Sequence, residues 1–253
     1  MNDFLSVENI SLAYQTPTEE TLAIKNVSIK VEEGQFVSIV GPSGCGKSTL
    51  LSCIAGLREP TSGKIYLQGE RVSGISEDMG YMLQSDNLLP WRSIYKNVML
   101  GLEIQKKLTD GNIQYVDDLL KKYGLWEFRH SYPSRLSGGM RQRVALIRTL
   151  VVKPRLLLLD EAFSALDYQT RVNVSCDVYN ILRKENKTMV MVTHDIPEAV
   201  AMSDKVIILS QRPAVVKQEL IMEFDRDKKD PINVRNDPRF QTYFNVVWGQ
   251  LQS

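Results

Sequence analysis

The fold of this 253-residue chain is decided by the segment GPSGCGKST at residues 41–49. The segment follows a short apolar run, Phe36 to Val40, and precedes apolar residues at helical spacing from Leu50 to Leu57. It matches the pattern G-x-x-x-x-G-K-[ST], in which glycines let backbone N–H groups turn toward phosphate oxygens beside the positive end of a helix. The sequence therefore predicts a strand, a phosphate-binding loop and a helix.

A loop of this kind assigns a role to each of its residues. Lys47 is expected to reach the β- and γ-phosphates of a nucleotide, and Ser48 is expected to hold Mg²⁺. The expected nucleotide contacts are Gly41, Pro42, Ser43, Gly44, Cys45, Gly46, Lys47, Ser48 and Thr49. A glycine-rich turn that merely opens a helix is the alternative interpretation.

Two adjacent carboxylates follow the apolar run Leu156 to Leu159. Sheets of α/β proteins bind ligands at the carboxyl ends of their strands, which is where Asp160 and Glu161 would lie. Asp160 is expected to support Mg²⁺ through a water molecule, and Glu161 is expected to polarise the attacking water. The alternative is an ordinary exposed Asp-Glu pair at the end of a strand.

The segment LSGGMRQR at residues 136–143 predicts a second anion-binding site. Ser137, Gly138 and Gly139 would open a helix that runs to about Val152, and they would present backbone N–H groups, a hydroxyl and a helix dipole to an anion. One nucleotide needs only one such loop. The second loop is therefore expected to serve a nucleotide that is bound by another copy of the chain.

Composition excludes several classes of protein. The chain is 43% hydrophobic and 24% charged, with 15 Gly and 10 Pro, which does not fit a disordered, collagen-like or coiled-coil protein. Its 31 basic and 30 acidic residues give a net charge of +1, so no global field attracts nucleic acid or an anionic bilayer. The three cysteines form no C-x-x-C pair, which argues against disulfides and zinc and favours the reducing cytosol.

No membrane signal is apparent in the sequence. Residues 1–10 carry two acids and no basic cluster before an apolar stretch, so no secretory signal is expected. The longest apolar runs have strand length, far below the roughly 18 residues that span a bilayer. If the protein serves a membrane, it is expected to do so from outside the lipid.

The order of the predicted elements indicates an α/β fold. Short strand patterns fill the first eighty residues, whereas residues 85–133 show helical patterns and no convincing strand. Strand candidates at residues 155–159, 189–193 and 205–209 then alternate with helical stretches, which predicts a mainly parallel sheet with helices on both sides.

A final amphipathic helix is predicted near the end of the chain. Asp237 would cap it, Pro238 would occupy its first turn, and one stripe would hold Phe240, Phe244, Val247, Trp248 and Leu251. Packing of this stripe on its own domain is the simpler interpretation. A dimer or regulatory contact is the alternative.

Taken together, these motifs resemble the ATP-binding subunits of ABC transporters over nearly the whole chain. The family order includes the phosphate loop, Gln84 in YMLQ, LSGG, LLLLDE, the loop Ser164-Ala165-Leu166-Asp167, and His194 in VTHD. The resemblance implies a P-loop NTPase core with a mainly parallel sheet, an N-terminal antiparallel β subdomain and an inserted α-helical subdomain. It divides the single domain 1–253 into a core at 1–84 and 134–220, a helical insert at 85–133 and a tail at 221–253.

The same resemblance implies roles for further residues. Tyr14 would stack on adenine, Gln84 would contact Mg²⁺ or the lytic water, and His194 would contact the γ-phosphate of ATP. Ser137, Gly138 and Gly139 would act on the facing subunit's nucleotide, and Asp167 would cross the same interface. A packed strand tyrosine, an exposed loop glutamine and a satisfied strand-end histidine are the respective alternatives. Met140 departs from the family's commoner glutamine, and hydrolysis is expected to survive this change.

The resemblance also implies partners and a location. A homodimer would enclose ATP, a separate membrane permease would bind it at the cytoplasmic face of the inner membrane, and an extracytoplasmic solute-binding protein would act indirectly. No nucleic acid is expected. Segments such as NLLPW at residues 87–91 resemble the nitrate, sulfonate and taurine branch of importers. The alternatives are another solute, export, or a non-transport ATPase that acts on DNA or ribosomes.

Two more expectations concern single side chains. Cys45 lies beside a helix N-terminus and Lys47, so a depressed pKa and a reactive thiolate are expected, whereas Cys53 should be shielded. Leu88, Leu89 and Trp91 are expected to cluster on the surface as a partner site for the permease. The alternative is that Trp91 packs inside the helical segment and only stabilises it.

Overall fold

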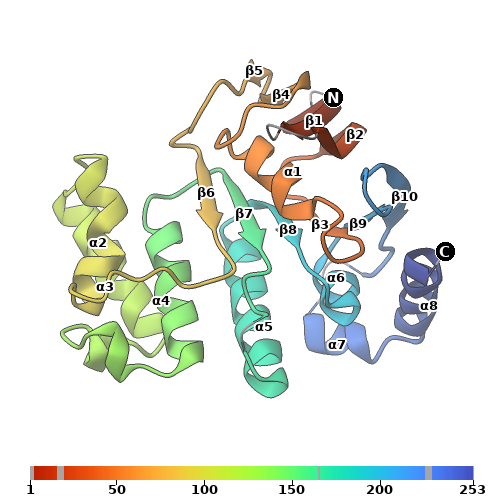
Figure 1. The fold of residues 1–253 in the computed structure, drawn as a ribbon. Coiled ribbons are helices and arrows are strands. Elements are labelled where there is room, and N and C mark those ends of the chain that lie inside the picture. Colours follow the sequence, from red (N-terminus) through yellow and green to blue (C-terminus); the bar gives the residue numbers. More distant parts are fainter. Residues whose placement is uncertain (1–2, 16–19, 165, 226–229, 253) are drawn as a thin grey trace. The chain divides into compact units, whose positions relative to one another are not determined.

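A computed structural model describes residues 3–15, 20–164, 166–225 and 230–252, so Ala165 of the predicted Ser164–Asp167 loop lies outside the described residues. The chain divides into two compact units, the first comprising Met1–Ser76 with Ser175–Ser253 and the second comprising Glu77–Val174. The elements are β1 (Leu5–Gln15), β2 (Glu20–Val31), β3 (Phe36–Val40), α1 (Lys47–Ile54), β4 (Ser62–Leu67), β5 (Glu70–Arg71), β6 (Met79–Met82), α2 (Ile94–Ile104), α3 (Asp110–Lys122), η1 (Trp126–Phe128), η2 (Pro133–Arg135), α4 (Gly138–Leu150), β7 (Leu156–Asp160), α5 (Tyr168–Lys184), β8 (Thr188–Val192), α6 (Ile196–Met202), β9 (Lys205–Leu209), β10 (Val216–Ile221), α7 (Pro231–Arg235) and α8 (Pro238–Gln252). Figure 1 shows them along the chain.

The first unit contains an antiparallel sheet in the strand order β2-β1-β4-β5. Leu5 of β1 pairs with Val31 of β2 on one side and with Leu67 of β4 on the other. The apolar residues that predict these strands, Val7 and Ile10 among them, are buried. The expected antiparallel N-terminal sheet is confirmed.

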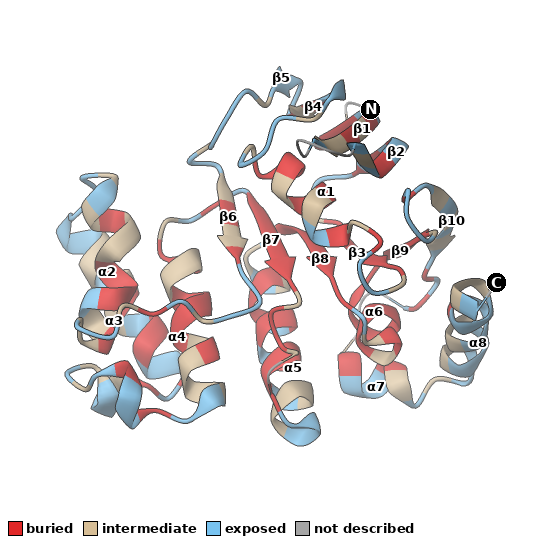
Figure 2. Ribbon diagram, in the orientation of Figure 1, coloured by how far each residue is buried: buried red, intermediate tan, exposed pale blue. Residues whose placement is uncertain are grey.

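A second set of strands in this unit lies in the order β10-β9-β3-β8. Strand β3 pairs in parallel with β8 and β9, and β10 closes the edge in antiparallel pairing with β9. Every residue of β3, β8 and β9 is buried, as Figure 2 shows, which is typical of parallel strands covered on both faces. Ile39 and Val192 are partners near the ends of these parallel strands, so the carboxyl ends of β3 and β8 lie at the same edge of the sheet.

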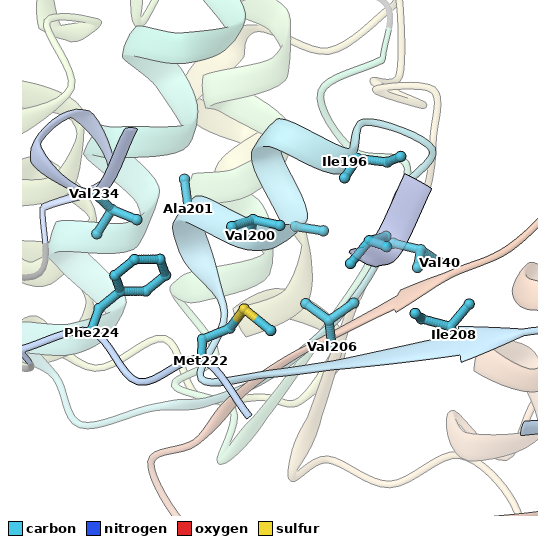
Figure 3. Close-up of a cluster of buried hydrophobic side chains, with 11 residues drawn as sticks. Val40, Ile196, Val200, Ala201, Val206, Ile208, Met222, Phe224 and Val234 are labelled. Atoms are coloured by element: carbon cyan, nitrogen blue, oxygen red, sulfur yellow. The ribbon is translucent and has the colours of Figure 1, made fainter. Parts of the chain in front are cut away.

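The C-terminal helices build a hydrophobic core in the first unit. Helices α6 and α8 contact each other, and α6 also contacts β3 while α8 contacts β9. Figure 3 shows the side chains that meet around α6, which include Val200, Ala201, Val206, Ile208, Met222 and Phe224. Val247 of α8 is fully buried in this core, so the final helix packs on its own domain.

Trp248 departs from the predicted stripe of α8. Phe240, Phe244 and Leu251 pack against the core as expected, but the Trp248 side chain is 52% exposed and stacks on Phe244 with 6.2 Å between ring centroids. Trp248 directly follows Val247, so the turn of the helix carries it away from the core. The predicted cap is confirmed, because Asp237 Oδ1 accepts the Arg239 N–H at 2.9 Å.

The second unit combines two parallel strands, β6 and β7, with helices α2, α3 and α4. The three helices contact one another, and α4 also packs on β6. Residues 85–133 are all described and contain no strand, as the sequence predicts. Ser93 caps α2 and Ser137 caps α4 through hydrogen bonds to Lys96 N and Met140 N.

Among the described residues, no helix combines the length and the apolar character that crossing a membrane requires.

Candidate nucleotide-binding and catalytic site

In the first unit, the phosphate loop connects the buried strand β3 to α1. Gly44 and Gly46 have φ values of +71° and +121°, a region that glycine adopts without a steric penalty. The buried ammonium of Lys47 donates hydrogen bonds to the carbonyl oxygens of Gly41 and Pro42, both at 2.9 Å. A methyl group at Gly44 would meet no atom within 4 Å, so the loop leaves open space. This donor-rich loop fits a nucleotide phosphate.

Cys45 differs from the expectation for a reactive thiol. Its side chain is only 1% exposed, and burial raises its pKa, although the charge of Lys47 acts in the opposite direction. From the helix N-terminus and Lys47, a lowered pKa was expected. That expectation is wrong because the Cys45 Sγ turns inward toward Gly41, and the sequence does not show this burial. Cys53 is buried as expected, and burial raises its pKa to about 11.

The three cysteines should therefore resist modification in the folded protein. At pH 7, N-ethylmaleimide is expected to label Cys45, Cys53 and Cys176 at least about tenfold more slowly than in urea-unfolded chain, because all three are buried and few thiolates form. Mass spectrometry of timed samples measures the labelling. Rapid labelling of Cys45 in the folded chain would contradict the structural explanation.

Tyr14 and Arg212 flank the phosphate loop within the first unit. The Tyr14 hydroxyl forms a 2.9 Å hydrogen bond with Thr49 Oγ1, which ties β1 to α1, and the Arg58 guanidinium lies 4.9 Å from the Tyr14 ring centroid. The Arg212 guanidinium donates to the Gly44 carbonyl at 3.0 Å. The tyrosine ring is thereby fixed beside the helix that follows the phosphate loop.

His194 lies at the carboxyl edge of β8. Because β8 runs parallel to its neighbour β3, His194 and the phosphate loop follow adjacent strand ends. His194 is exposed, and the next residue, Asp195, caps α6 by accepting the Glu198 N–H at 2.9 Å. The short turn between β8 and α6 thus presents the imidazole at the edge that carries the phosphate loop.

In the second unit, β7 delivers the two predicted carboxylates at its end. Asp160 is buried and its Oδ2 accepts the Tyr81 hydroxyl at 3.1 Å. Glu161 has φ +47°, and its Oε2 accepts the Gln84 side-chain amide at 3.2 Å. A left-handed backbone at a residue other than glycine costs free energy, and such residues are concentrated at functional sites. The hydrogen bond shows that the structure brings Gln84 and Glu161 together.

The LSGG segment begins α4 in the second unit. Ser137 Oγ accepts the Met140 N–H at 3.3 Å, and both Ser137 and Gly138 are exposed. A Cβ atom at Gly139 would lie 2.8 Å from Thr170 Cγ2, so a larger residue here would require the Thr170 side chain to shift.

Asp167 has a local role at the start of α5. Its Oδ1 accepts the Thr170 N–H at 3.0 Å, and this hydrogen bond lowers the pKa of the Asp167 carboxyl. Asp167 is exposed, so its carboxylate also remains accessible from outside this unit.

The predicted residues divide between the two units. Tyr14, the phosphate loop and His194 belong to the first, whereas Gln84, Ser137, Gly138, Gly139, Asp160, Glu161 and Asp167 belong to the second. Among the described residues, no three His, Cys, Asp or Glu side chains form a group that could hold a metal ion.

Arg212 is the residue near the loop that sequence reasoning missed. The segment LSQRP at residues 209–213 lies after β9, far along the chain from Gly44, and no spacing rule connects the two. The only signal in the sequence was an arginine beside a proline in the turn after β9. This signal places Arg212 near Gly44 only once β9 is known to pair in parallel with β3.

Comparison with known proteins places these motifs in a wider context. A family model described as ABC transporter matches residues 24–164. The ABC transporter ATP-binding protein YtlC of Bacillus subtilis is 44% identical, covering 99% of this chain and 96% of YtlC. The nitrate import ATP-binding protein NrtD of Synechocystis is 38% identical over 98% of this chain and 95% of NrtD.

Solved structures agree with this relationship. The dimeric post-hydrolysis structure of the ATP-binding cassette MJ0796, bound to ADP and Pi, matches with a TM-score of 0.76 at 31% identity. The match covers 87% of this chain and 100% of that chain. Sequence and fold thus lead to the same group of proteins.

Proposed function

Because this chain belongs to the ABC transporter family and is an ATP-binding, ATP-hydrolysing subunit, we propose that it powers uptake of a small solute through a separate membrane permease. The solute would be nitrate, a sulfonate, taurine or a similar compound. The observation that carries the proposal is the full-length similarity to the nitrate import protein NrtD, together with the importer-like segments such as NLLPW at residues 87–91.

The residues of the site divide the work of hydrolysis. Lys47 and the backbone N–H groups of the phosphate loop bind the phosphates of ATP, and Tyr14 orients the adenine by stacking. Glu161 accepts a proton from the attacking water, while the Gln84 amide holds the Glu161 carboxylate in place. His194 donates a hydrogen bond toward the γ-phosphate. Ser48, Gln84 and, through water, Asp160 would hold Mg²⁺, which neutralises phosphate charge.

A homodimer would complete each site. Ser137, Gly138 and Gly139 lie at the positive end of the 13-residue helix α4, where the exposed Ser137 hydroxyl and backbone N–H groups suit an anion. A nucleotide on the facing subunit would occupy this position, with Asp167 at the same interface. The dimeric structure of the related cassette MJ0796 supports this assembly.

The helical segment would contact the permease. We assign residues 85–133 to a helical subdomain, 1–84 and 134–220 to the nucleotide-binding core, and 221–253 to a tail. Trp91 is 73% exposed, which favours its role as an anchor and disfavours packing inside the subdomain. Leu88 is buried and Leu89 is partly buried, so the expected cluster of three exposed residues reduces to Trp91. The permease would hold the chain at the cytoplasmic face of the inner membrane.

Replacement of Trp91 by alanine tests the permease contact. The melting temperature and the basal ATPase activity of the isolated subunit are expected to change little, because an exposed side chain adds little stability. Co-purification with the permease should weaken, and substrate-stimulated hydrolysis should fall at least about tenfold. Trp248→Ala, at a similarly exposed tryptophan of the first unit, is the matched control. Normal stimulation in the Trp91 variant would exclude the coupling role.

Growth of a deletion strain tests the solute class. Loss of the gene is expected to abolish growth on nitrate as the nitrogen source, or on taurine or an aliphatic sulfonate as the sulfur source. The wild-type gene on a plasmid should restore growth, and the Glu161→Gln gene should not. Normal growth and normal uptake of all three solutes in the deletion strain would contradict the proposed class.

A further inference from the structure

The segment 84–92, here called the coupling loop, is held by side chains of α4. The Arg148 guanidinium donates to the carbonyl oxygens of Asp86 and Asn87, both at 2.7 Å. Arg141 Nε donates to the Asp86 carboxylate at 2.8 Å, and the Gln142 side chain donates to the Gln84 carbonyl at 3.3 Å. Successive turns of one helix thus bind three of the first four residues of the loop.

Arg148 is suited to this task by its shape. Its fork places two N–H donors on neighbouring carbonyl groups, which the single ammonium of a lysine cannot match in the same geometry. Burial lowers the pKa of Arg148, and the nearby Asp86 opposes this effect. Because the partners are main-chain carbonyls, Arg148 fixes the path of the loop whatever side chains Asp86 and Asn87 carry.

The far end of the coupling loop is held by α2. Asn97 is fully buried, and its side chain accepts the Leu89 N–H at 2.7 Å and donates to the Leu89 and Arg92 carbonyls at 3.1 and 3.0 Å. Side chains of two helices therefore replace the secondary structure that this segment lacks. The loop begins at Gln84, which contacts Glu161, and the exposed Trp91 lies between the two residues that Asn97 holds.

We infer that Arg148 is a positioning residue for ATP hydrolysis. By binding the Asp86 and Asn87 carbonyls to α4, it holds the neighbouring Gln84 in place. Loss of this attachment then changes the position of the Gln84 amide against Glu161. The inference rests on the proposed role of Gln84 at the hydrolytic site.

A double-mutant cycle tests the inference in the full-length subunit. Arg148→Lys keeps the charge but loses the two-carbonyl fork, and it is expected to lower kcat for ATP about tenfold with KM changed less than about twofold. Gln84→Ala alone should lower kcat by a similar factor, about tenfold. Added to Gln84→Ala, the Arg148→Lys change should lower kcat by less than about twofold further, since its effect passes through Gln84.

The outcomes separate the inference from the function it rests on. If Gln84→Ala hydrolyses normally, the proposed role of Gln84 is wrong. If Gln84→Ala is impaired but the two effects multiply, or Arg148→Lys alone has no effect, the positioning role of Arg148 is wrong. Arg155→Lys is the control, because this exposed arginine of the same unit lies 3.4 Å from the Asp78 carboxylate, outside the coupling loop. It should leave kcat unchanged.

If Arg148→Lys lowers the stability of the protein, hydrogen exchange distinguishes local loosening of the coupling loop from general destabilisation. Amides of residues 86–92 are expected to exchange about tenfold faster in Arg148→Lys, while amides in the middle of α4 keep their protection. Equal acceleration throughout α4 would show general destabilisation and would overturn the inference. Wild-type exchange in the loop would also overturn it, because the fork would then not hold the loop.

Discussion

Replacement of Glu161 by glutamine is expected to reduce ATP turnover by about 10²–10⁴-fold while ATP binding persists, because a positioned general base contributes that much to a rate. Glutamine keeps the size of the side chain and an oxygen that can accept the Gln84 amide, which lies 3.2 Å from Glu161 Oε2 in the wild type. The substitution therefore removes the proton acceptor and leaves the geometry in place.

The same variant should accumulate as an ATP-bound dimer. Since hydrolysis would normally reopen the assembly, blocked turnover with intact binding traps two chains around their nucleotides. Gel filtration with ATP and Mg²⁺ measures the dimer, and phosphate release measures turnover. Glu127→Gln, an exposed glutamate in the same unit, is the control and should behave as wild type. A monomeric Glu161→Gln protein with normal hydrolysis would contradict both roles.

Replacement of Arg183 by methionine is expected to lower the free energy of unfolding by about 3–5 kcal/mol, because it leaves a buried carboxylate without its cation. Arg183 donates to both carboxylate oxygens of Asp204 at 2.7 and 2.6 Å and to the Gly34 carbonyl at 3.0 Å. Its guanidinium also lies 3.9 Å from the Phe36 ring centroid. The Asp204 side chain is 7% exposed and accepts the Phe36 N–H at 2.8 Å.

This cluster anchors the start of β3, the strand that leads into the phosphate loop. Urea denaturation should give the loss in free energy, and the melting temperature should fall by roughly 6–20 °C for a chain of this size. The double variant Arg183→Met with Asp204→Asn should recover part of the loss, since no charge then stays buried. A loss below about 1 kcal/mol in Arg183→Met would show that Asp204 finds another partner or solvent.

Local patterns predicted the elements of the fold well. The apolar run before Gly41 predicted β3 because a strand buried on both faces needs uninterrupted apolar residues. Ser137 predicted the start of α4 because its hydroxyl can satisfy a helix N–H group within the next turn. Each of these signals is contained in a few consecutive residues.

Side-chain environments were harder to predict, because they depend on contacts distant in sequence. The sequence places Cys45 beside Lys47 and a helix start, but not the inward turn that buries its thiol. It groups Leu88 with Trp91, yet one is buried and the other exposed. The carbonyls that Arg148 binds lie 61 and 62 residues earlier in the chain, a separation that no helical or strand periodicity connects.

Solute transport in proteoliposomes tests the proposed import function most directly. The vesicles would contain this chain and its membrane permease, with ATP and Mg²⁺ enclosed and with solute and its binding protein outside. Nitrate, taurine or a sulfonate is predicted to accumulate inside with wild-type chain, and accumulation should stop with Glu161→Gln. Export of solute that was preloaded inside the vesicles would contradict an ATPase that powers uptake. ATP hydrolysis without any solute movement would contradict it as well.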